Sequence, residues 1–264
     1  MIAKLHIETK LRDNCTHLKK VYATPPFKIA DVREDKRDKT LQLMLMSSSP
    51  GILDSDEYHI KVDLDKDCSL DLQTQSYQRI FNMQGSALQQ VEVHMAQGSS
   101  FQYLPHPSVP HENSAFTAKN RIYLSDNCRL IWGEVLTCGR KLNGEVFLFT
   151  KYHNLTEIFL NGKLIIKENL LMLPKQINVS AMGQLEGYTH QGSLIYLDDD
   201  ANARQIKESI NTFLTKQPNI AYGVTEAPQN GIIVRILGQK AEQLHNCLKA
   251  IANIINAKNI AVYA

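Results

Sequence analysis

The sequence lacks a charge excess, a long apolar run and a large aromatic content, and each absence narrows its function. Its 264 residues include 29 Lys and Arg against 27 Asp and Glu, a net charge of +2. A nucleic-acid-binding chain needs clustered cations, so we expect no nucleic-acid partner. No apolar run reaches the ~18 residues of a membrane helix, so we expect no membrane partner either.

Cysteine is scarce and scattered. The five cysteines are an odd number with no secretory signal before them, which predicts reduced thiols in a cytoplasmic protein. Residues 1–14 alternate apolar and charged side chains, so they predict a strand instead of a signal peptide. In a cytoplasmic protein the glycosylation sequons at Asn154 and Asn178 are chance matches.

The usual catalytic signatures are missing as well. The sequence contains no G-x-S-x-G elbow, no G-x-x-x-x-G-K-[ST] or G-x-G-x-x-G loop, and neither C-x-x-C nor H-E-x-x-H. Asn161-Gly162-Lys163 belongs to a hairpin turn, and the mixed charges of residues 31–39 are typical of a solvated loop. These absences favour a protein that is not an enzyme.

What the sequence does contain is a repeated strand–turn–strand pattern. Alternating apolar residues flank polar turns at 67–69, 97–99, 126–128 and 161–162, about 30 residues apart. One such unit cannot bury its own apolar face, so it must stack on the next unit. We therefore predict a mainly β chain with a layered, β-helix-like body over residues 1–192. An ordinary β sandwich is the alternative.

From residue 193 the pattern changes. Apolar residues at helical spacing predict helices over 202–217 and 239–256. Short strands, an Asn-Gly hairpin and a closing strand at 259–263 complete a β-α-β-β-α-β order. We predict a C-terminal α+β unit over 193–264 that packs on the body and covers an open end.

Several histidines are candidate metal ligands. His106 and His111 bracket a Pro-Ser-Val-Pro loop with Glu112 beside the second, and such a set can hold a borderline divalent ion such as nickel. Two histidines in an irregular loop are more commonly surface residues, so both interpretations stay open. His59 lies near three carboxylates on a predicted strand, and His190 lies at a glycine-flanked turn.

Three carboxylates are stronger candidates. Glu134 lies inside the apolar run Ile-Trp-Gly-Glu-Val-Leu, where a carboxylate must be paired or face a wet channel. Glu145 follows Arg140 in a tight turn, close enough for a charge-assisted pair. That pair either holds the turn or borders a polar passage. Asp56 follows a Pro-Gly turn.

Four segments, in this order and spacing, are similar to one known family. They are SSSPGILDSDEY, LQTQSYQRIF, LPHPSVPHENSAF and LIWGEVLTCGRKLNGEVF. Together they resemble the urease accessory protein UreD family, also called UreH, over about residues 20–190. The matching positions are Ser49, Pro50, Gly51, Asp56, Thr74, Gln75, Arg79, Phe81, Pro105, Pro107, Glu134, Gly139, Arg140, Gly144 and Glu145.

The chain departs from the family pattern mainly in its first turn. Ile52 stands where a second glycine is usual, and Ser55 stands where a glycine precedes Asp56. Arg79 stands where lysine is common. These changes remove no candidate ligand, but they predict a different local shape for the first turn.

The resemblance implies a β-helix-like body with two helices packed on it. It implies a non-enzymatic scaffold that joins the partners UreF and the GTPase UreG on the urease apoprotein, in a complex that inserts nickel. It also implies a polar tunnel in which nickel is held only transiently, with no tightly bound cofactor. We assign nickel passage to Asp56, Glu134, Glu145, His59, His106 and His111. We assign structural or interaction roles to Pro50, Gly51, Thr74, Gln75, Arg79, Pro105, Pro107, Gly139, Arg140 and Gly144.

The competing hypothesis is a β-solenoid enzyme acting on carbohydrate. It needs two carboxylates about 5–10 Å apart in an open groove, together with aromatic platforms. Aromatic residues make up only 7% of the chain, and Trp132 lies in an apolar run. Both features disfavour this alternative.

Overall fold

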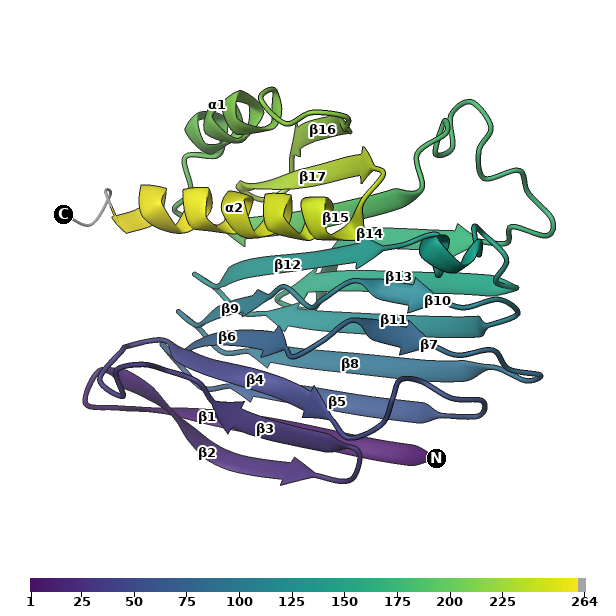
Figure 1. Cartoon of the computed structure of the whole chain (residues 1–264). Coiled ribbons are helices and arrows are strands. Elements are labelled where there is room, and N and C mark those ends of the chain that lie inside the picture. Colours follow the sequence, from purple (N-terminus) through teal and green to yellow (C-terminus); the bar gives the residue numbers. More distant parts are fainter. Residues whose placement is uncertain (261–264) are drawn as a thin grey trace.

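A computed structural model describes the backbone of residues 1–260 as two large β sheets and two helices (Figure 1). The order of the seven-stranded sheet is β14 (Lys163–Met172), β13 (Lys151–Leu160), β11 (Ala115–Leu124), β8 (Ala87–Met95), β5 (Glu57–Leu64), β1 (Ile2–Arg12), β2 (Cys15–Ala23). The main path of the ten-stranded sheet is β16 (Ala221–Glu226), β17 (Gly231–Gly238), β15 (His190–Asp198), β12 (Arg129–Leu136), β9 (Ser100–Tyr103), β6 (Ser69–Thr74), β4 (Leu41–Ser47), β3 (Phe27–Asp31). Two short strands complete it off this path, β7 (Gln78–Ile80) and β10 (Ser108–Pro110).

The chain alternates between the two sheets. Each of the units β5–β6, β8–β9 and β11–β12 places its first strand in the seven-stranded sheet and its second in the ten-stranded sheet. Equivalent strands of successive units pair in parallel, so equivalent apolar residues come into register. In this way Val62, Val93 and Ile122 form one row, and Leu70, Phe101 and Leu130 form a row of the facing sheet. Both rows belong to one buried core between the sheets.

The turns between these strands stack in the same way. Asp67, Gly98 and Asn127 all have positive φ values, a conformation that glycine, asparagine and aspartate adopt most readily. The N–H of Asp67 donates to the Gln97 carbonyl at 3.1 Å, and the N–H of Gly98 donates to the Asp126 carbonyl at 3.1 Å. The predicted turns are confirmed, and they are bonded to one another as well as to their own strands.

The predicted mainly β class with two helices is confirmed. Both sheets are mixed, because antiparallel strands flank the parallel centre of each. The sheets face each other across one core, which is a feature of the β sandwich that we considered as the alternative. The chain alternates between the two sheets, which is a feature of the predicted layered body. The β-helix-like layering itself remains a prediction.

The C-terminal strands continue the ten-stranded sheet. Strand β15 pairs antiparallel with β12, and β17 pairs with β15. Helix α1 (Ala203–Leu214) and helix α2 (Ala241–Ile260) pack against this end of the sheet, where a second apolar core forms (Figure 1). The closing strand predicted at 259–263 is wrong at its start, because Asn259 and Ile260 belong to α2. The rest of that prediction lies outside the described residues.

Small residues let α2 approach the sheet closely. A Cβ added at Gly133 would lie 2.4 Å from a side-chain carbon of Leu104 and 3.5 Å from Leu248 of α2, and one at Gly192 would lie 3.6 Å from Leu244 of α2. The helix distances are ordinary van der Waals contacts, so a side chain longer than a single Cβ at either position would crowd α2. Neither helix in the described part of the chain is long and apolar enough to cross a membrane.

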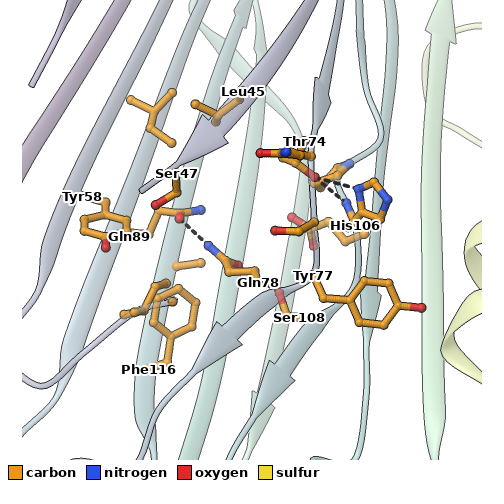
Figure 2. Close-up of a pocket in the computed structure, with 18 of the residues that line it drawn as sticks. Leu45, Ser47, Tyr58, Thr74, Tyr77, Gln78, Gln89, His106, Ser108 and Phe116 are labelled. Carbon is orange, nitrogen blue, oxygen red and sulfur yellow. Dashed lines mark hydrogen bonds between the residues drawn. The ribbon is translucent and has the colours of Figure 1, made fainter. Parts of the chain in front are cut away.

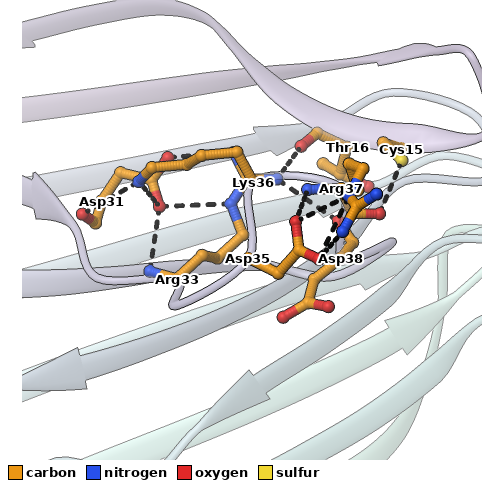
Figure 3. Close-up of polar contacts among 8 residues, drawn as sticks. All are labelled: Cys15, Thr16, Asp31, Arg33, Asp35, Lys36, Arg37 and Asp38. Carbon is orange, nitrogen blue, oxygen red and sulfur yellow. Dashed lines mark hydrogen bonds and ion pairs between the residues drawn. The ribbon is translucent and has the colours of Figure 1, made fainter.

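The charged run at 31–39 contains one buried cation (Figure 3). The Arg33 side chain is only 4% exposed and binds Asp31 through two nitrogens, at 3.1 and 2.9 Å. Its remaining terminal nitrogen donates to the backbone carbonyls of Thr16 and Asp38. The hydrogen bonds from Arg33 hold the pKa of Asp31 well below its usual range. The solvated-loop prediction therefore holds for most of the run but not for Arg33, which joins the loop to β2.

We expect Arg33→Ala to lower the free energy of unfolding by about 2–3 kcal/mol, because the Thr16 carbonyl loses its buried donor and Asp31 keeps only the exposed Lys36 as a cationic partner. The matched control is Arg37→Ala, since Arg37 makes a similar pair with Asp35 but is 89% exposed. Exposed pairs contribute little, so the control should unfold like the wild type. Equal unfolding curves for the two variants in urea would contradict the structural role of Arg33.

Candidate functional site

A cavity of about 130 Å³ lies between the two sheets. Its walls come from strands of both sheets and from the loops before β7 and β10 (Figure 2). Although the surrounding core is apolar, much of the lining is polar. The main polar side chains are Thr74, Gln78, Gln89, Asn120, Glu134 and Asn154.

Strand pairing brings these polar residues together. Gln89 lies opposite Ala118, and Ala118 lies opposite Asn154, on three neighbouring strands. One inward position further along, Asn120 lies opposite Thr156. Because alternate residues of a strand face the same side, all these side chains point between the sheets. Buried polar groups must be hydrogen-bonded there, and their partners define the site.

Glu134 is the centre of this polar network. Its Oε1 accepts hydrogen bonds from the Trp132 indole N–H at 3.1 Å and from the Asn120 amide at 3.2 Å. The Asn154 amide donates to the other carboxylate oxygen. Asn120 is itself fixed by contacts of 2.9 Å with Asn154 and with Thr156. The carboxyl group is thus held by an indole and two amides, and no ion pair with a Lys or Arg is found among the described side chains.

Enclosure changes the acidity of Glu134. Burial raises its pKa to about 7, although the hydrogen bonds from Trp132 and Asn154 act in the opposite direction. The side chain keeps some accessible surface because it borders the cavity, which opens to the surface beside exposed residues such as Tyr77. Burial, and next the charge of Glu134, also raises the pKa values of Tyr103 and Tyr152. Near neutral pH this carboxyl group can exchange its proton for a cation.

Further hydrogen bonds between polar side chains line the same cavity (Figure 2). The Gln78 amide donates to Gln89 at 2.7 Å, and the Ser108 hydroxyl donates to Gln78 at 3.0 Å. Thr74 contacts His106 at two points, the backbone N–H at 2.8 Å and Nδ1 at 3.1 Å. Amide and hydroxyl oxygens therefore form a polar wall along the cavity.

Several residues predicted from the sequence line this cavity together. Besides Glu134 and His106 they are Pro50, Gly51, Thr74, Gln75 and Pro105. The reason for one glycine is clear, because a Cβ at Gly51 would lie 2.4 Å from the Arg79 carbonyl oxygen. That carbonyl accepts the N–H of Ile52 at 2.8 Å. Gly51 and Arg79 thus join two turns beside the cavity.

Asp56 acts as an anchor for the neighbouring turn. It is 2% exposed, lies 3.0 Å from the Met1 ammonium and accepts the Leu53 N–H at 2.9 Å. The Tyr58 hydroxyl donates to it at 3.3 Å, and Tyr58 lines the cavity. Burial, and next the charge of Asp56, raises the pKa of Tyr58 to about 12. Every oxygen of this carboxylate already has a partner.

Glu145 and Arg140 form the predicted ion pair. Arg140 Nε donates to Glu145 at 2.9 Å, and a second Arg140 nitrogen contacts the other oxygen. These bonds lower the pKa of Glu145. Gly139 and Gly144 have φ values of 121° and 83°, which strain any other residue, so both glycines are needed for the turn. Pro107, predicted in the loop on the other side, is buried before β10.

The histidines are separated from one another. His106 lies against His245 of α2, whereas the His111 ring packs on Phe81 at 4.7 Å. His59 lies on the outer face of β5, 3.6 Å from Glu57. Burial lowers the pKa of the remaining candidate, His190, to about 4. Within residues covered by the structure, no group of three or more His, Cys, Asp and Glu side chains is arranged to hold a metal ion.

Sequence reasoning missed the amides that hold Glu134. Asn120 and Asn154 occupy inward positions of otherwise apolar alternations, and this was the available signal. Asn154 and Thr156, which form a sequon, are both buried between the sheets. For the carbohydrate-enzyme alternative, the described lining of the cavity offers Glu134 as its one carboxylate, not the pair that the chemistry needs.

The pKa of Glu134 predicts a pH-dependent stability. Between its ordinary value of 4.5 and about 7 the folded chain keeps a proton that the unfolded chain has lost, so stability falls as the pH rises through this window. Glu134→Gln removes this effect. From about pH 5 to pH 8 the unfolding free energy of the wild type should fall relative to the variant by roughly 1–2 kcal/mol.

The measurement is urea unfolding of both proteins across that range. His190 and His245, whose pKa values burial lowers to about 4, act in the opposite direction, but they do so equally in both proteins. If the difference in unfolding free energy between the wild type and the variant does not change from pH 5 to pH 8, Glu134 is ionised throughout this range.

Comparison with known proteins agrees with these motifs and extends them. A sequence profile of the UreD urease accessory protein family matches residues 1–262, so the similarity also includes the C-terminal unit. A protein of Flavobacterium johnsoniae named urease accessory protein UreD is 49% identical over 252 residues, which are 95% of this chain and 91% of that protein. Proteins of the same name from Acetivibrio thermocellus and Haemophilus influenzae are 35% and 34% identical, over 96% and 97% of this chain and 97% and 100% of their own lengths. The chain therefore belongs to the UreD family of urease accessory proteins.

Proposed function

We propose that this chain is a non-enzymatic scaffold for urease maturation that gives nickel a polar path toward the urease active site. It acts in the cytoplasm, in a complex with UreF and the GTPase UreG on the urease apoprotein. Membership of a family of urease accessory proteins supports the role in maturation. The interior network around Glu134 supports the path, and it is the single observation that carries this proposal.

The chemistry of the cavity suits a transient cation. The carboxyl group of Glu134, with a pKa near 7, can release its proton as a cation arrives and recover it when the cation leaves. Elsewhere in the lining of the same cavity, the side-chain oxygens of Gln78, Gln89 and Thr74 can replace part of the hydration shell of the ion. Oxygen donors bind nickel more weakly than thiolates or several imidazoles, so the ion is not trapped. Nickel is thus cargo, with no tightly bound cofactor.

On this proposal, some of the other predicted residues shape the protein and others remain candidates for contact with nickel. Asp56, Glu145 and Arg140 are committed to turns, so we assign them to shaping the ends of the body. His106 lines the same cavity as Glu134 and remains a candidate on the nickel path. His59 and His111 contact other groups, and their part in nickel passage stays a prediction.

We expect Glu134→Ala to reduce urease activation at least tenfold in cells that depend on this chain. The variant removes the only carboxylate of the described cavity lining, while the outer surfaces stay unchanged. Urease activity and the nickel content of purified urease are the readouts. The control is Glu92→Ala, because Glu92 is 47% exposed and lies on the outer face of β8. Full activation by Glu134→Ala would refute the interior path.

Complex formation gives a separate prediction. In a urease-positive host, both the wild type and Glu134→Ala should retain UreF and urease in pull-downs, because the substitution is internal. Loss of nickel transfer with retained partners would separate passage from assembly. Recovery of neither UreF nor urease with the wild type would remove the support for a scaffold.

A further inference from the structure

Two histidines from distant parts of the chain meet where α2 crosses the ten-stranded sheet. His106 lies in the loop between β9 and β10, and His245 lies on α2. Their ring centres are 4.8 Å apart with the planes tilted by 50°. No motif in the sequence links these positions, since only the docking of α2 brings them together.

His245 is buried at this contact with one ring nitrogen unpartnered. The residue is 4% exposed. Its Nε2 is buried without a hydrogen-bond partner. In the tautomer that is protonated at Nδ1, the lone pair on Nε2 is free for a ligand. A buried acceptor without a donor is unusual and calls for a ligand or a bound water.

His106 is held by the side chain of Thr74. The Thr74 hydroxyl oxygen contacts the His106 backbone N–H at 2.8 Å and Nδ1 at 3.1 Å. Figure 2 shows both contacts as dashed lines. When the hydroxyl oxygen accepts from Nδ1, the second lone pair is again on Nε2. Histidines that bind metals typically have this arrangement, with one ring nitrogen fixed by a protein oxygen and the other facing the ion.

Both rings are neutral near pH 7, as metal ligands must be. Burial lowers the pKa of His245 to about 4, and burial also lowers the pKa of His106. Lys249, one turn along α2, lowers both pKa values further. The ring spacing is also suitable, because two imidazoles bound to one ion at about 2.0–2.1 Å have centres roughly 4.5–5.5 Å apart.

We propose that His106 and His245 bind one divalent first-row transition-metal ion through their Nε2 atoms and so join α2 to the β9–β10 loop. Water completes the coordination, since no third protein ligand is arranged there within the described residues. The charge of Lys249, which lowers the pKa values of both histidines, opposes a cation at this site. The proposal stands whether or not nickel passes Glu134.

The test is calorimetric titration of the purified, untagged chain with Ni²⁺ and with Zn²⁺. We expect one site in the wild type and at least a tenfold loss of affinity in His106→Ala and in His245→Ala. The control is His153→Ala, an outer-face histidine bonded to Asn169, which should bind like the wild type. Lys249→Ala should bind several-fold more tightly because it removes the opposing charge.

X-ray absorption of the loaded wild type should show two imidazole ligands. If His245→Ala does not fold, as judged by circular dichroism, the less buried His106→Ala carries the test. Equal affinity in the wild type and in a folded histidine variant would overturn the proposal, as would a spectrum without imidazole scattering. Because Glu134 is intact in all these variants, a failure of metal binding at the histidines can be distinguished from a failure of urease activation by Glu134→Ala.

Discussion

A carboxylate between two sheets must be protonated, paired or hydrogen-bonded, and this constraint on Glu134 organises the interior of the protein. In the part of the chain that the structure describes no cation pairs with it, and an indole and two amides hold it instead. These donors come from β12, β11 and β13, two strands of one sheet and one of the other. The polar centre therefore exists only because the chain alternates between the sheets and stacks in register.

The sequence predicted the local features well, because each has a local physical cause. Asp67, Gly98 and Asn127 mark turns that need positive φ, and the alternating residues around them are strands. Ile206, Ile210 and Leu214 repeat at helical spacing, and they are the buried residues of α1. Glu134 was identified because a carboxylate interrupts an apolar strand.

The contacts between distant strands could not be predicted from the sequence, because they depend on long-range strand pairing. Which neighbours Glu134 would meet depends on the register of β11 against β13, and periodicity within one strand does not fix that register. For the same reason Asn154 stood out only as a sequon, and His106 was grouped with His111 instead of His245. The residues that match the family motifs are mainly residues that shape turns. Gly51 admits the Arg79 carbonyl, and Gly139 and Gly144 shape the turn that Arg140 and Glu145 close.

The residues that shape the β body are different from the residues that give its cavity chemical character. The ion pairs and glycines fix the turns at the ends of the strands, whereas amides, hydroxyls and one carboxyl group line the cavity between the sheets. Membership of the UreD family gives this arrangement a context in urease maturation. On the function that we propose, a metal ion is transferred without being retained. A single carboxyl group in a polar interior binds a metal ion more weakly than a closed set of strong ligands does, and weak binding suits that task.

The central claim is that Glu134 is an enclosed carboxyl group that takes up and releases a proton near neutral pH. Infrared difference spectra between the wild type and Glu134→Gln, recorded as a function of pH, measure this directly through the carbonyl band of the protonated acid. We expect the band to disappear with a midpoint near pH 7. A midpoint near the ordinary value of 4.5 would contradict it, because Glu134 would then be ionised and well solvated in the folded protein.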